Sequence, residues 1–210
     1  EADLSKMAAI GLPFWMAGAY GTSERVAAAV AAGAEGVQVG TVFAMSSDSG
    51  LPDEARALML ERLRNDELVV RNDPRASPTG FPFKVISVDG TVSQESVYDA
   101  RPRLCDLSYL RQAYQREDGT VGYRCAAEPV HMWEKKGGTL EDTVGRKCLC
   151  NGLVATIGMA QHRKDGYVED RIMTLGEDLE GPRELLARHP QGWSAVEALA
   201  YLQEGLGTSP

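Results

Sequence analysis

The sequence predicts an α/β fold, with a parallel sheet in the first third of the chain. Three observations indicate this class: two short apolar runs end at glycine, an alanine-rich helical pattern separates them, and a second helical pattern follows. Strand, helix, strand and helix at this spacing imply parallel strands with helices outside the sheet. A chain of 210 residues is long enough to bury a core.

The first elements follow from local patterns. Leu4 and Met7 begin a helical pattern within the first residues of the chain. Residues 12–17 (LPFWMA) are a compact apolar run, which predicts a strand buried on both faces. Thr22 or Ser23 is placed to cap the alanine-rich helix that comes next, because a hydroxyl side chain can accept a hydrogen bond from the first helical amides.

Gly33 provides the stop of this helix, and residues 36–39 predict the second strand. Residues 42–49 suit a brief extra helix. Residues 52–63 predict a longer amphipathic helix, with apolar side chains on one face and charged side chains on the other.

After residue 66 the pattern changes. Residues 67–71 predict one more strand, and residues 84–88 an edge strand closed by a turn. Between them, residues 73–82 contain three prolines and predict an irregular loop. Residues 98–152 are rich in short elements and loops. We therefore expect two parts, residues 1–66 with the parallel sheet and residues 67–210 as a loop-rich extension.

Two helical patterns lie in the last third of the chain. Residues 152–161 form an apolar, helix-like run, and residues 193–202 predict an amphipathic helix capped by Ser194. The extension is thus expected to end in helices.

The two predicted parallel strands end in small residues, Ala17-Gly18-Ala19 and Gly40-Thr41. Ligands of parallel α/β sheets bind beyond the carboxyl ends of the strands. Small residues there let main-chain N–H groups approach a phosphate, and the hydroxyl of Thr41 can donate one more hydrogen bond. Glycine also ends many buried strands simply to turn the chain. The two strand ends together favour a phosphate-bearing ligand.

The block GLPFWMAGAYGTSERVAAAVAAGAEGVQVGTVFAMSSDSG resembles the C-terminal half of the nitronate monooxygenase family, formerly called 2-nitropropane dioxygenases. The family pattern has AGGI on one strand and ALGADGVQVGT around the next, which here read AGAY and AAGAEGVQVGT. The resemblance is close over the first 65 residues or so. Further blocks (DPRASPTGFPFKV, GYRCAAEPV and VGRKCLCNGL) are similar to one branch of the family.

The resemblance implies the C-terminal part of an FMN-dependent (β/α)₈ TIM barrel, followed by the loop-rich region and the C-terminal helices. It implies that the FMN phosphate is bound by residues at the strand ends, namely Ala17, Gly18, Ala19, Gln38, Gly40 and Thr41. Ala19 stands where the family has a second glycine, so a positive φ there would be strained.

A TIM barrel needs eight strands and roughly 250 residues. The half of the family that carries the flavin-ring contacts and the catalytic histidine has no counterpart in this sequence, and the chain opens at Glu1 without a methionine. We therefore expect the 210 residues to be the C-terminal part of a longer protein, or one chain of a pair. Its partner would be the missing barrel half, and the chain alone would be inactive.

The family's activity is the oxidation of alkyl nitronates, a small-molecule substrate, with O₂ to carbonyl compounds and nitrite. Two alternatives stay open. One is a flavin-dependent enoyl-thioester reductase that uses NAD(P)H, and the other is a non-catalytic module whose cysteine region forms a metal-stabilised interaction surface.

All four cysteines, Cys105, Cys125, Cys148 and Cys150, lie within one loop-rich stretch. Four thiols can enclose zinc or hold an iron–sulfur cluster, although their spacing matches no established ligand motif. The alternative is four reduced cysteines that pack as small apolar side chains. The three histidines, His131, His162 and His189, are scattered, and each is expected to be a surface or packing residue. For His131, the nearest to the cysteine region, the alternative is a metal ligand. Ser46, Ser47 and Asp48 either rim the active site or form an ordinary loop.

The net charge of −8 disfavours binding to nucleic acid, whose phosphates an acidic surface repels. No apolar run approaches the roughly 20 residues needed to span a bilayer. The start of the chain lacks the basic and apolar regions of a signal peptide. The simplest expectation is a cytoplasmic protein.

Overall fold

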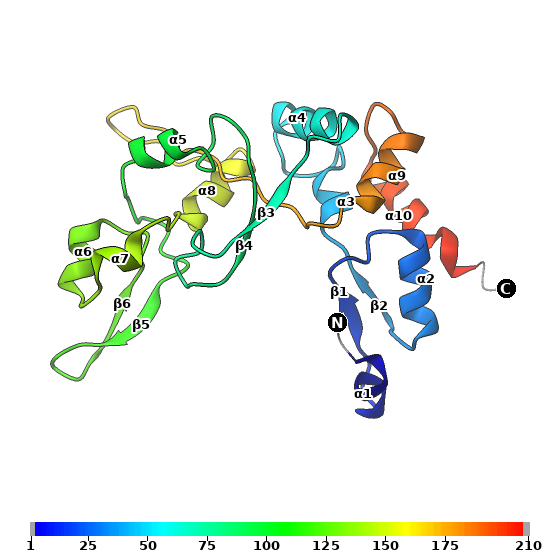
Figure 1. Cartoon of the computed structure of the whole chain (residues 1–210), viewed down its shortest axis with the longest axis horizontal. Coiled ribbons are helices and arrows are strands. Elements are labelled where there is room, and N and C mark those ends of the chain that lie inside the picture. The colour runs from blue at the N-terminus through cyan, green and yellow to red at the C-terminus, as the bar shows by residue number, and fades with distance from the viewer. Residues whose placement is uncertain (1–2, 208–210) are drawn as a thin grey trace. The chain divides into compact units, whose positions relative to one another are not determined.

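The computed structural model describes residues 3–207 and divides into two units, each of which is described by itself (Figure 1). The first unit combines the chain up to Leu68 with the chain from Leu175 onward, and the second comprises Val69–Thr174. The last helices of the chain therefore belong to the first unit. The first residue, on which the expectation about the start of the chain rests, lies outside the described residues.

The first unit begins with α1 (Leu4–Ala9) and contains the predicted parallel strand pair. β1 (Trp15–Ala17) pairs with β2 (Gly36–Gln38) in parallel, and Ala17 lies opposite Gln38. α2 (Ser23–Ala31) connects them, and the side chain of its N-cap, Thr22, accepts a hydrogen bond from the amide of Arg25. The predicted order of strand, helix and strand is confirmed.

The expectation that the first strand is buried on both faces is wrong. Met16 is buried, whereas its neighbour Trp15 is 62% exposed. Successive side chains of a strand point to opposite faces. Phe14 and Met16 pack with Ala29 and Ala34, while the opposite face of β1 carries Trp15 into solvent.

Two further helices follow β2, as the sequence predicts. α3 (Thr41–Ala44) is a single turn whose N-cap is Gly40, and α4 (Asp53–Arg64) is three turns long. The buried side chains of α4 are Ala55, Met59, Leu60 and Leu63. These residues recur every three to four positions, so the apolar stripe of the pattern is the buried face of the helix.

The C-terminal part of the first unit consists of α9 (Glu180–Arg188), α10 (Ala195–Gln203) and the short 3₁₀ helix η1 (Glu204–Leu206). Ser194 caps α10 as predicted, in a reciprocal capping box with Glu197. The start of α9 lies directly against the loop after β1. A Cβ added at Gly181 would come within 1.8 Å of the carbonyl oxygen of Gly21, so the close packing there requires glycine.

The second unit contains two antiparallel strand pairs. β3 (Val70–Asp73) pairs with β4 (Phe83–Ile86), and β5 (Gln112–Gln115) pairs with β6 (Val121–Arg124). The strand expected near residues 67–71 is thus antiparallel, and it does not extend the parallel sheet. Within residues 3–207, parallel pairing is confined to β1 and β2, so these residues form a mixed α/β structure with short sheets and do not form an eight-stranded barrel.

Four short helices complete the second unit: α5 (Glu95–Ala100), α6 (Val130–Lys135), α7 (Leu140–Thr143) and α8 (Leu149–Thr156). The helix-like run expected at residues 152–161 therefore begins and ends earlier than predicted. Across the described part of the chain, no helix is both long enough and apolar enough to cross a membrane.

Candidate functional site

The carboxyl ends of β1 and β2 lie side by side, because Ala17 and Gln38 are partners in the parallel register. The chain leaves β1 through Gly18 and Ala19 and leaves β2 through Val39 and Gly40. Ala17, Gly18, Ala19, Gln38 and Gly40 are exposed, and Thr41 is half-buried. The structure therefore brings the six residues of the predicted phosphate site to one edge of the sheet.

The backbone of these strand ends leaves room for a ligand. A Cβ built on Gly18 or on Gly40 would meet no atom within 4 Å. The N-cap of α3 is Gly40, so no N-cap side chain accepts a hydrogen bond from the first amides of this helix. Since α3 has only four residues, its dipole is small, and main-chain amides are what these ends can offer to an anion.

Ala19 has a φ of 57°, which lies in the left-handed region. A positive φ was expected to be strained at this position, because alanine has a Cβ atom that glycine lacks. This conformation costs a non-glycine residue on the order of 1–2 kcal/mol. The Nη1 atom of Arg25 donates a hydrogen bond of 2.9 Å to the carbonyl oxygen of Ala19 and so helps to hold the strained turn.

The segment that follows residue 174 lies against the same strand ends. The amide of Gly176 donates a hydrogen bond to Thr41 Oγ1 at 3.0 Å, which leaves the hydroxyl proton of Thr41 for another acceptor. The guanidinium of Arg25 is paired with the carboxylates of Asp178 and Glu180. Arg25 carries the positive charge that is nearest in sequence to the turn after β1, and the two carboxylates neutralise this charge.

Ser46, Ser47 and Asp48 have structural roles. Ser46 is buried, and its hydroxyl donates to the carbonyl oxygen of Phe43. The Asp48 carboxylate accepts a 2.6 Å hydrogen bond from the amide of Ala195, at the first turn of α10. Of the two interpretations offered by the sequence, the structure favours a loop that anchors the C-terminal helices.

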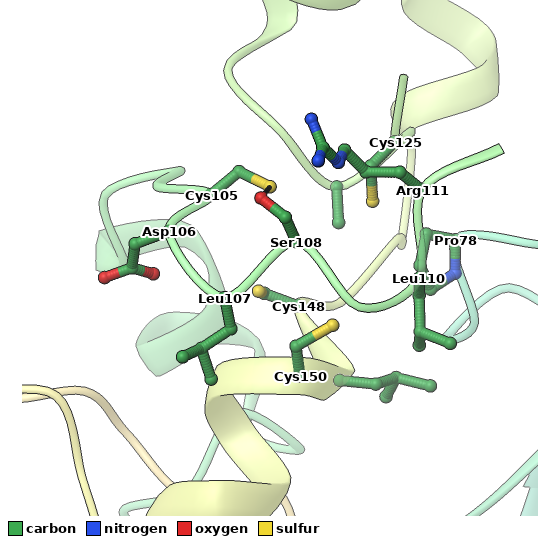
Figure 2. A pocket seen from close by; sticks show the side chains of 12 residues that line it. Pro78, Cys105, Asp106, Leu107, Ser108, Leu110, Arg111, Cys125, Cys148 and Cys150 are labelled. Atoms are coloured by element: carbon green, nitrogen blue, oxygen red, sulfur yellow. Dashed lines mark hydrogen bonds between the residues drawn. The ribbon is translucent and has the colours of Figure 1, made fainter. Parts of the chain in front are cut away.

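In the second unit, the four cysteines line one small pocket, and all are free thiols (Figure 2). Cys105 and Cys125 come from loops, Cys148 is the N-cap of α8, and Cys150 is in its first turn. The pocket has a volume of about 10 Å³. Residues far apart in the sequence thus bring their thiols to one place, which spacing alone could not predict.

Burial keeps two of these thiols protonated. Removal from water raises the pKa of Cys125 to about 11, and the same cause raises the pKa of Cys148 to about 11. Neutral thiols are poor nucleophiles, so Cys125 and Cys148 are not reactive cysteines. Within residues 3–207, no three His, Cys, Asp or Glu side chains are already arranged as a metal-binding group. The structure thus shows the four cysteines together but does not show a formed zinc or iron–sulfur site, which was one of the two alternatives left open by the sequence.

A buried polar network lies directly beside the cysteines. Glu169 has a fully buried side chain and pairs with the guanidinium groups of Arg101 and Arg163. The amide nitrogen of Asn151 donates to Asp106 at 2.7 Å and to Glu169 at 3.2 Å. The Arg163 hydrogen bond lowers the pKa of Asp106 to about 2. Nothing in the spacing of these residues signals the network, because its members are up to 68 positions apart.

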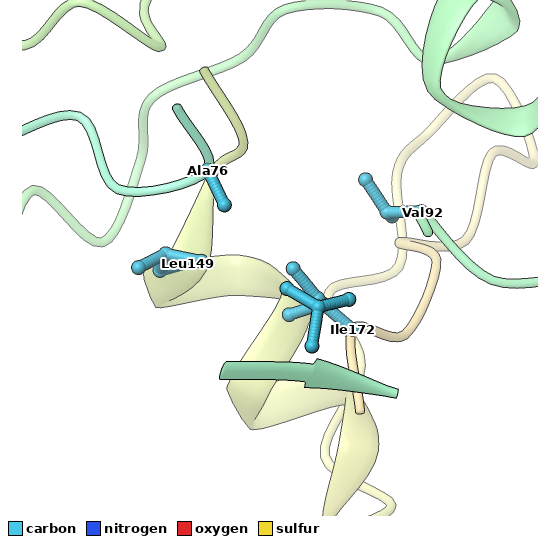
Figure 3. Close-up of a cluster of buried hydrophobic side chains, with 5 residues drawn as sticks. Ala76, Val92, Leu149 and Ile172 are labelled. Atoms are coloured by element: carbon cyan, nitrogen blue, oxygen red, sulfur yellow. The ribbon is translucent and has the colours of Figure 1, made fainter. Parts of the chain in front are cut away.

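The apolar core of the second unit adjoins the thiol pocket through Leu149, which belongs to both. Leu149 packs in a buried cluster with Ala76, Val85, Val92 and Ile172 (Figure 3). This cluster fixes the start of α8, and with it the positions of the two cysteines at residues 148 and 150.

The histidines lie where the sequence expects them. His131 and His162 are exposed, and His189 is half-buried. His189 Nδ1 lies 3.2 Å from Glu197 Oε1, a pairing that the sequence did not predict. None of the three histidines lines the thiol pocket.

The nitronate monooxygenase family model matches residues 4–80 of the chain. This segment covers α1 through β3 and includes both strand ends, so it supports the family resemblance over somewhat more than a third of the chain. The comparisons with curated proteins and with solved structures produced no match. The fold and the comparison together therefore support a mixed α/β structure whose residues 4–80 are similar to the nitronate monooxygenase family.

Proposed function

We propose that the first unit binds the phosphate of FMN in an oxidoreductase of the nitronate monooxygenase type, which oxidises alkyl nitronates with O₂ to carbonyl compounds and nitrite. The observation that carries the proposal is the parallel pair of β1 and β2, whose adjacent ends lie inside the segment matched by the family model. This is the position where parallel α/β proteins bind phosphorylated ligands.

The residues present are compatible with a phosphate group. Gly18 and Gly40 leave open space, and main-chain amides beside them can donate to phosphate oxygens. The Thr41 hydroxyl can donate while its oxygen holds the amide of Gly176. Because Arg25 is already paired with two carboxylates, the proposal assigns phosphate recognition to main-chain amides and to this hydroxyl.

Bound FMN would supply the redox chemistry, since a flavin can accept electrons from a nitronate and pass them to oxygen. The part of this chain is to hold the phosphate tail, and through it to orient the cofactor. Ala17 and Gln38 are the last residues of β1 and β2, and they border the proposed phosphate site on the side of the sheet. The proposal places the catalytic base outside this chain, in a complementing barrel half.

Large apolar side chains at and before β1 are exposed, and this exposure supports the proposal of a complementing partner that would cover them. Leu12 is 68% exposed and Trp15 62% exposed. In a larger barrel the outer edge of a strand pair and its uncovered face would be paired and buried. The proposed partner is therefore the rest of the barrel, in the same polypeptide or in a second chain.

The direct test is a flavin titration of the chain together with a complementing N-terminal barrel half. We expect the complex to retain the visible absorbance of FMN and to release nitrite from an alkyl nitronate in air. Gly40→Val would place an isopropyl group in the open space and weaken FMN binding about tenfold or more, a loss of about 1.4 kcal/mol or more. The control is Ala57→Val, which adds a similar bulk on the exposed face of α4.

Two results would contradict the proposal. One is a complex that does not retain FMN, and the other is a Gly40→Val variant that binds FMN as tightly as the unmodified chain. Consumption of NAD(P)H with an enoyl thioester, without nitrite release from nitronates, would instead support the reductase alternative, which could use the same strand ends.

A further inference from the structure

The second unit carries a feature that the proposed flavin chemistry does not use. All four cysteines of the chain meet at one pocket (Figure 2), although they come from three separate segments. Cysteines that pack as small apolar side chains can occupy any part of a core, whereas the ligands of one metal ion have to meet at one point, as these four do. We propose that these four thiols form a site for a single Zn²⁺ ion.

The segments that bear the thiols are held in place by buried polar contacts. Asn151, next to Cys150, donates to Asp106, next to Cys105. The amide of Cys125 donates to Glu128 Oε1 at 3.4 Å, and Glu128 is paired with Lys136 at 2.7 Å. These contacts fix the backbone at the cysteines, as the outer contacts of metal sites do.

The pocket has room for a single ion and not for a larger ligand. A volume of about 10 Å³ corresponds to one water-sized sphere, so the pocket is too small for an organic ligand or a multi-iron cluster. Apart from the thiols, its walls include the apolar side chains of Leu107, Leu110 and Leu149. Soft thiolate ligands in an apolar shell favour zinc over magnesium or calcium.

The thiols must turn toward the ion for the site to form. A cysteine has one side-chain torsion, so its sulfur can move between staggered positions while the backbone stays in place. On binding, each sulfur loses its proton to solvent and forms one bond to zinc. Four protons leave, no electrons are transferred, and the tetrahedral site carries a net charge of −2.

Arg111 lines the pocket and can balance part of this charge. Arg101 is already paired with Glu169 through its Nε atom, and it also acts electrostatically on the Cys148 thiol. Arg101 is buried, and its Nη2 atom has no hydrogen-bond partner. An orphaned buried guanidinium nitrogen is costly, and a thiolate beside it would offset that cost.

The test is elemental analysis of the full chain, purified with reductant from cells supplied with zinc. We expect about one zinc ion per chain and little iron or sulfide. Each of the four variants Cys105→Ser, Cys125→Ser, Cys148→Ser and Cys150→Ser should lose most of the zinc. Leu107→Val changes a side chain that lines the same pocket without removing a thiol or a side-chain hydrogen bond to one, so it serves as the matched control.

A second measurement does not depend on the folding of variants. Co²⁺ added to the reduced, unmodified chain should give the sulfur-to-metal charge-transfer bands of a tetrahedral thiolate site, and zinc should remove them. Bound zinc should also protect the four thiols from alkylation until a chelator is added. Zinc well below half an ion per chain with no cobalt spectrum overturns the proposal, and so does iron with acid-labile sulfide in place of zinc.

Discussion

The first unit presents its candidate site at the open ends of two strands, whereas the second unit holds its thiols, one buried and three half-buried, beside a buried polar network. At the strand ends, five of the six candidate residues are exposed, and glycines leave space around the backbone. Around the thiols, ion pairs with Glu169 and Glu128 hold the chain from several sides. The comparison suggests that the first site relies on a ligand or partner to cover it, while the second is assembled by the fold itself.

The units also differ in what stabilises them. In the first, the indole of Trp193 is 2% exposed, and its Nε1 donates to the carbonyl oxygen of Val42 at 2.7 Å. In the second, the charged side chain of Glu169 is fully buried between two arginines. An apolar anchor and a polar network should respond differently to mutation, which makes the division of the chain testable.

The largest effect is expected from Trp193→Ala. The variant should lose about 3–5 kcal/mol of unfolding free energy, because it leaves a cavity and an orphaned carbonyl. Hydrogen exchange measured by mass spectrometry should show lost protection in α3 and α10 and little change in the second unit. Trp15→Ala is the matched control, since Trp15 is 62% exposed, and it should cost under about 1 kcal/mol. Equal loss of protection in both units would show that they unfold together.

The next effect concerns the polar network. Glu169→Ala leaves the buried guanidinium of Arg101 without its carboxylate and leaves Arg163 with Asp106 alone. The variant should cost about 3 kcal/mol or more. Denaturant unfolding should report this loss, and hydrogen exchange should place it in α8 and in the loop that carries Cys105. Glu204→Ala removes the partner of Arg188 in an exposed pair and serves as the control, with an expected cost below about 1 kcal/mol. A Glu169→Ala variant as stable as this control would disprove the role assigned to the network.

A smaller effect is expected at the packing between α9 and the loop after β1. Gly181→Ala should cost about 1–3 kcal/mol, because its Cβ would overlap the Gly21 carbonyl oxygen and force the two segments apart. Thermal melts of Gly181→Ala and Gly40→Ala would measure the contrast, since a Cβ at Gly40 meets open space. If the two variants have the same melting temperature, the close approach at Gly181 does not contribute to stability.

The smallest effect depends on pH. Main-chain and side-chain hydrogen bonds from Ser194 lower the pKa of Glu197 below its ordinary value of 4.5, with a further contribution from His189. Because the folded-state pKa is lowered, the stabilisation is present above pH 4.5 and is lost as the pH falls through the folded-state pKa. Wild type and Glu197→Gln should therefore differ slightly near neutral pH and converge in acid. Urea unfolding at several pH values checks this, and a difference that grows in acid would reverse the assigned sign.

Much of the first unit was predictable from the sequence, because its signals are local. The cap at Thr22, the stop near Gly33, and the capping box of Ser194 all act over three or four residues. The direction of β3 was not predictable, since residues 67–71 are equally compatible with either direction of pairing. The exposure of Trp15 depends on which face of β1 the helices cover, and that also lies outside the local pattern.

The sequence by itself determined where the chain turns, where its helices are capped, and which two neighbouring strands end in small residues. Only the tertiary structure decided that four cysteines share one pocket, and that the helices after residue 175 belong with the first unit. The physical reason is the distance along the sequence between the residues that interact. Caps and turns are hydrogen bonds between near neighbours, while the thiol pocket and its ion pairs join residues tens of positions apart, which only the folded chain brings together.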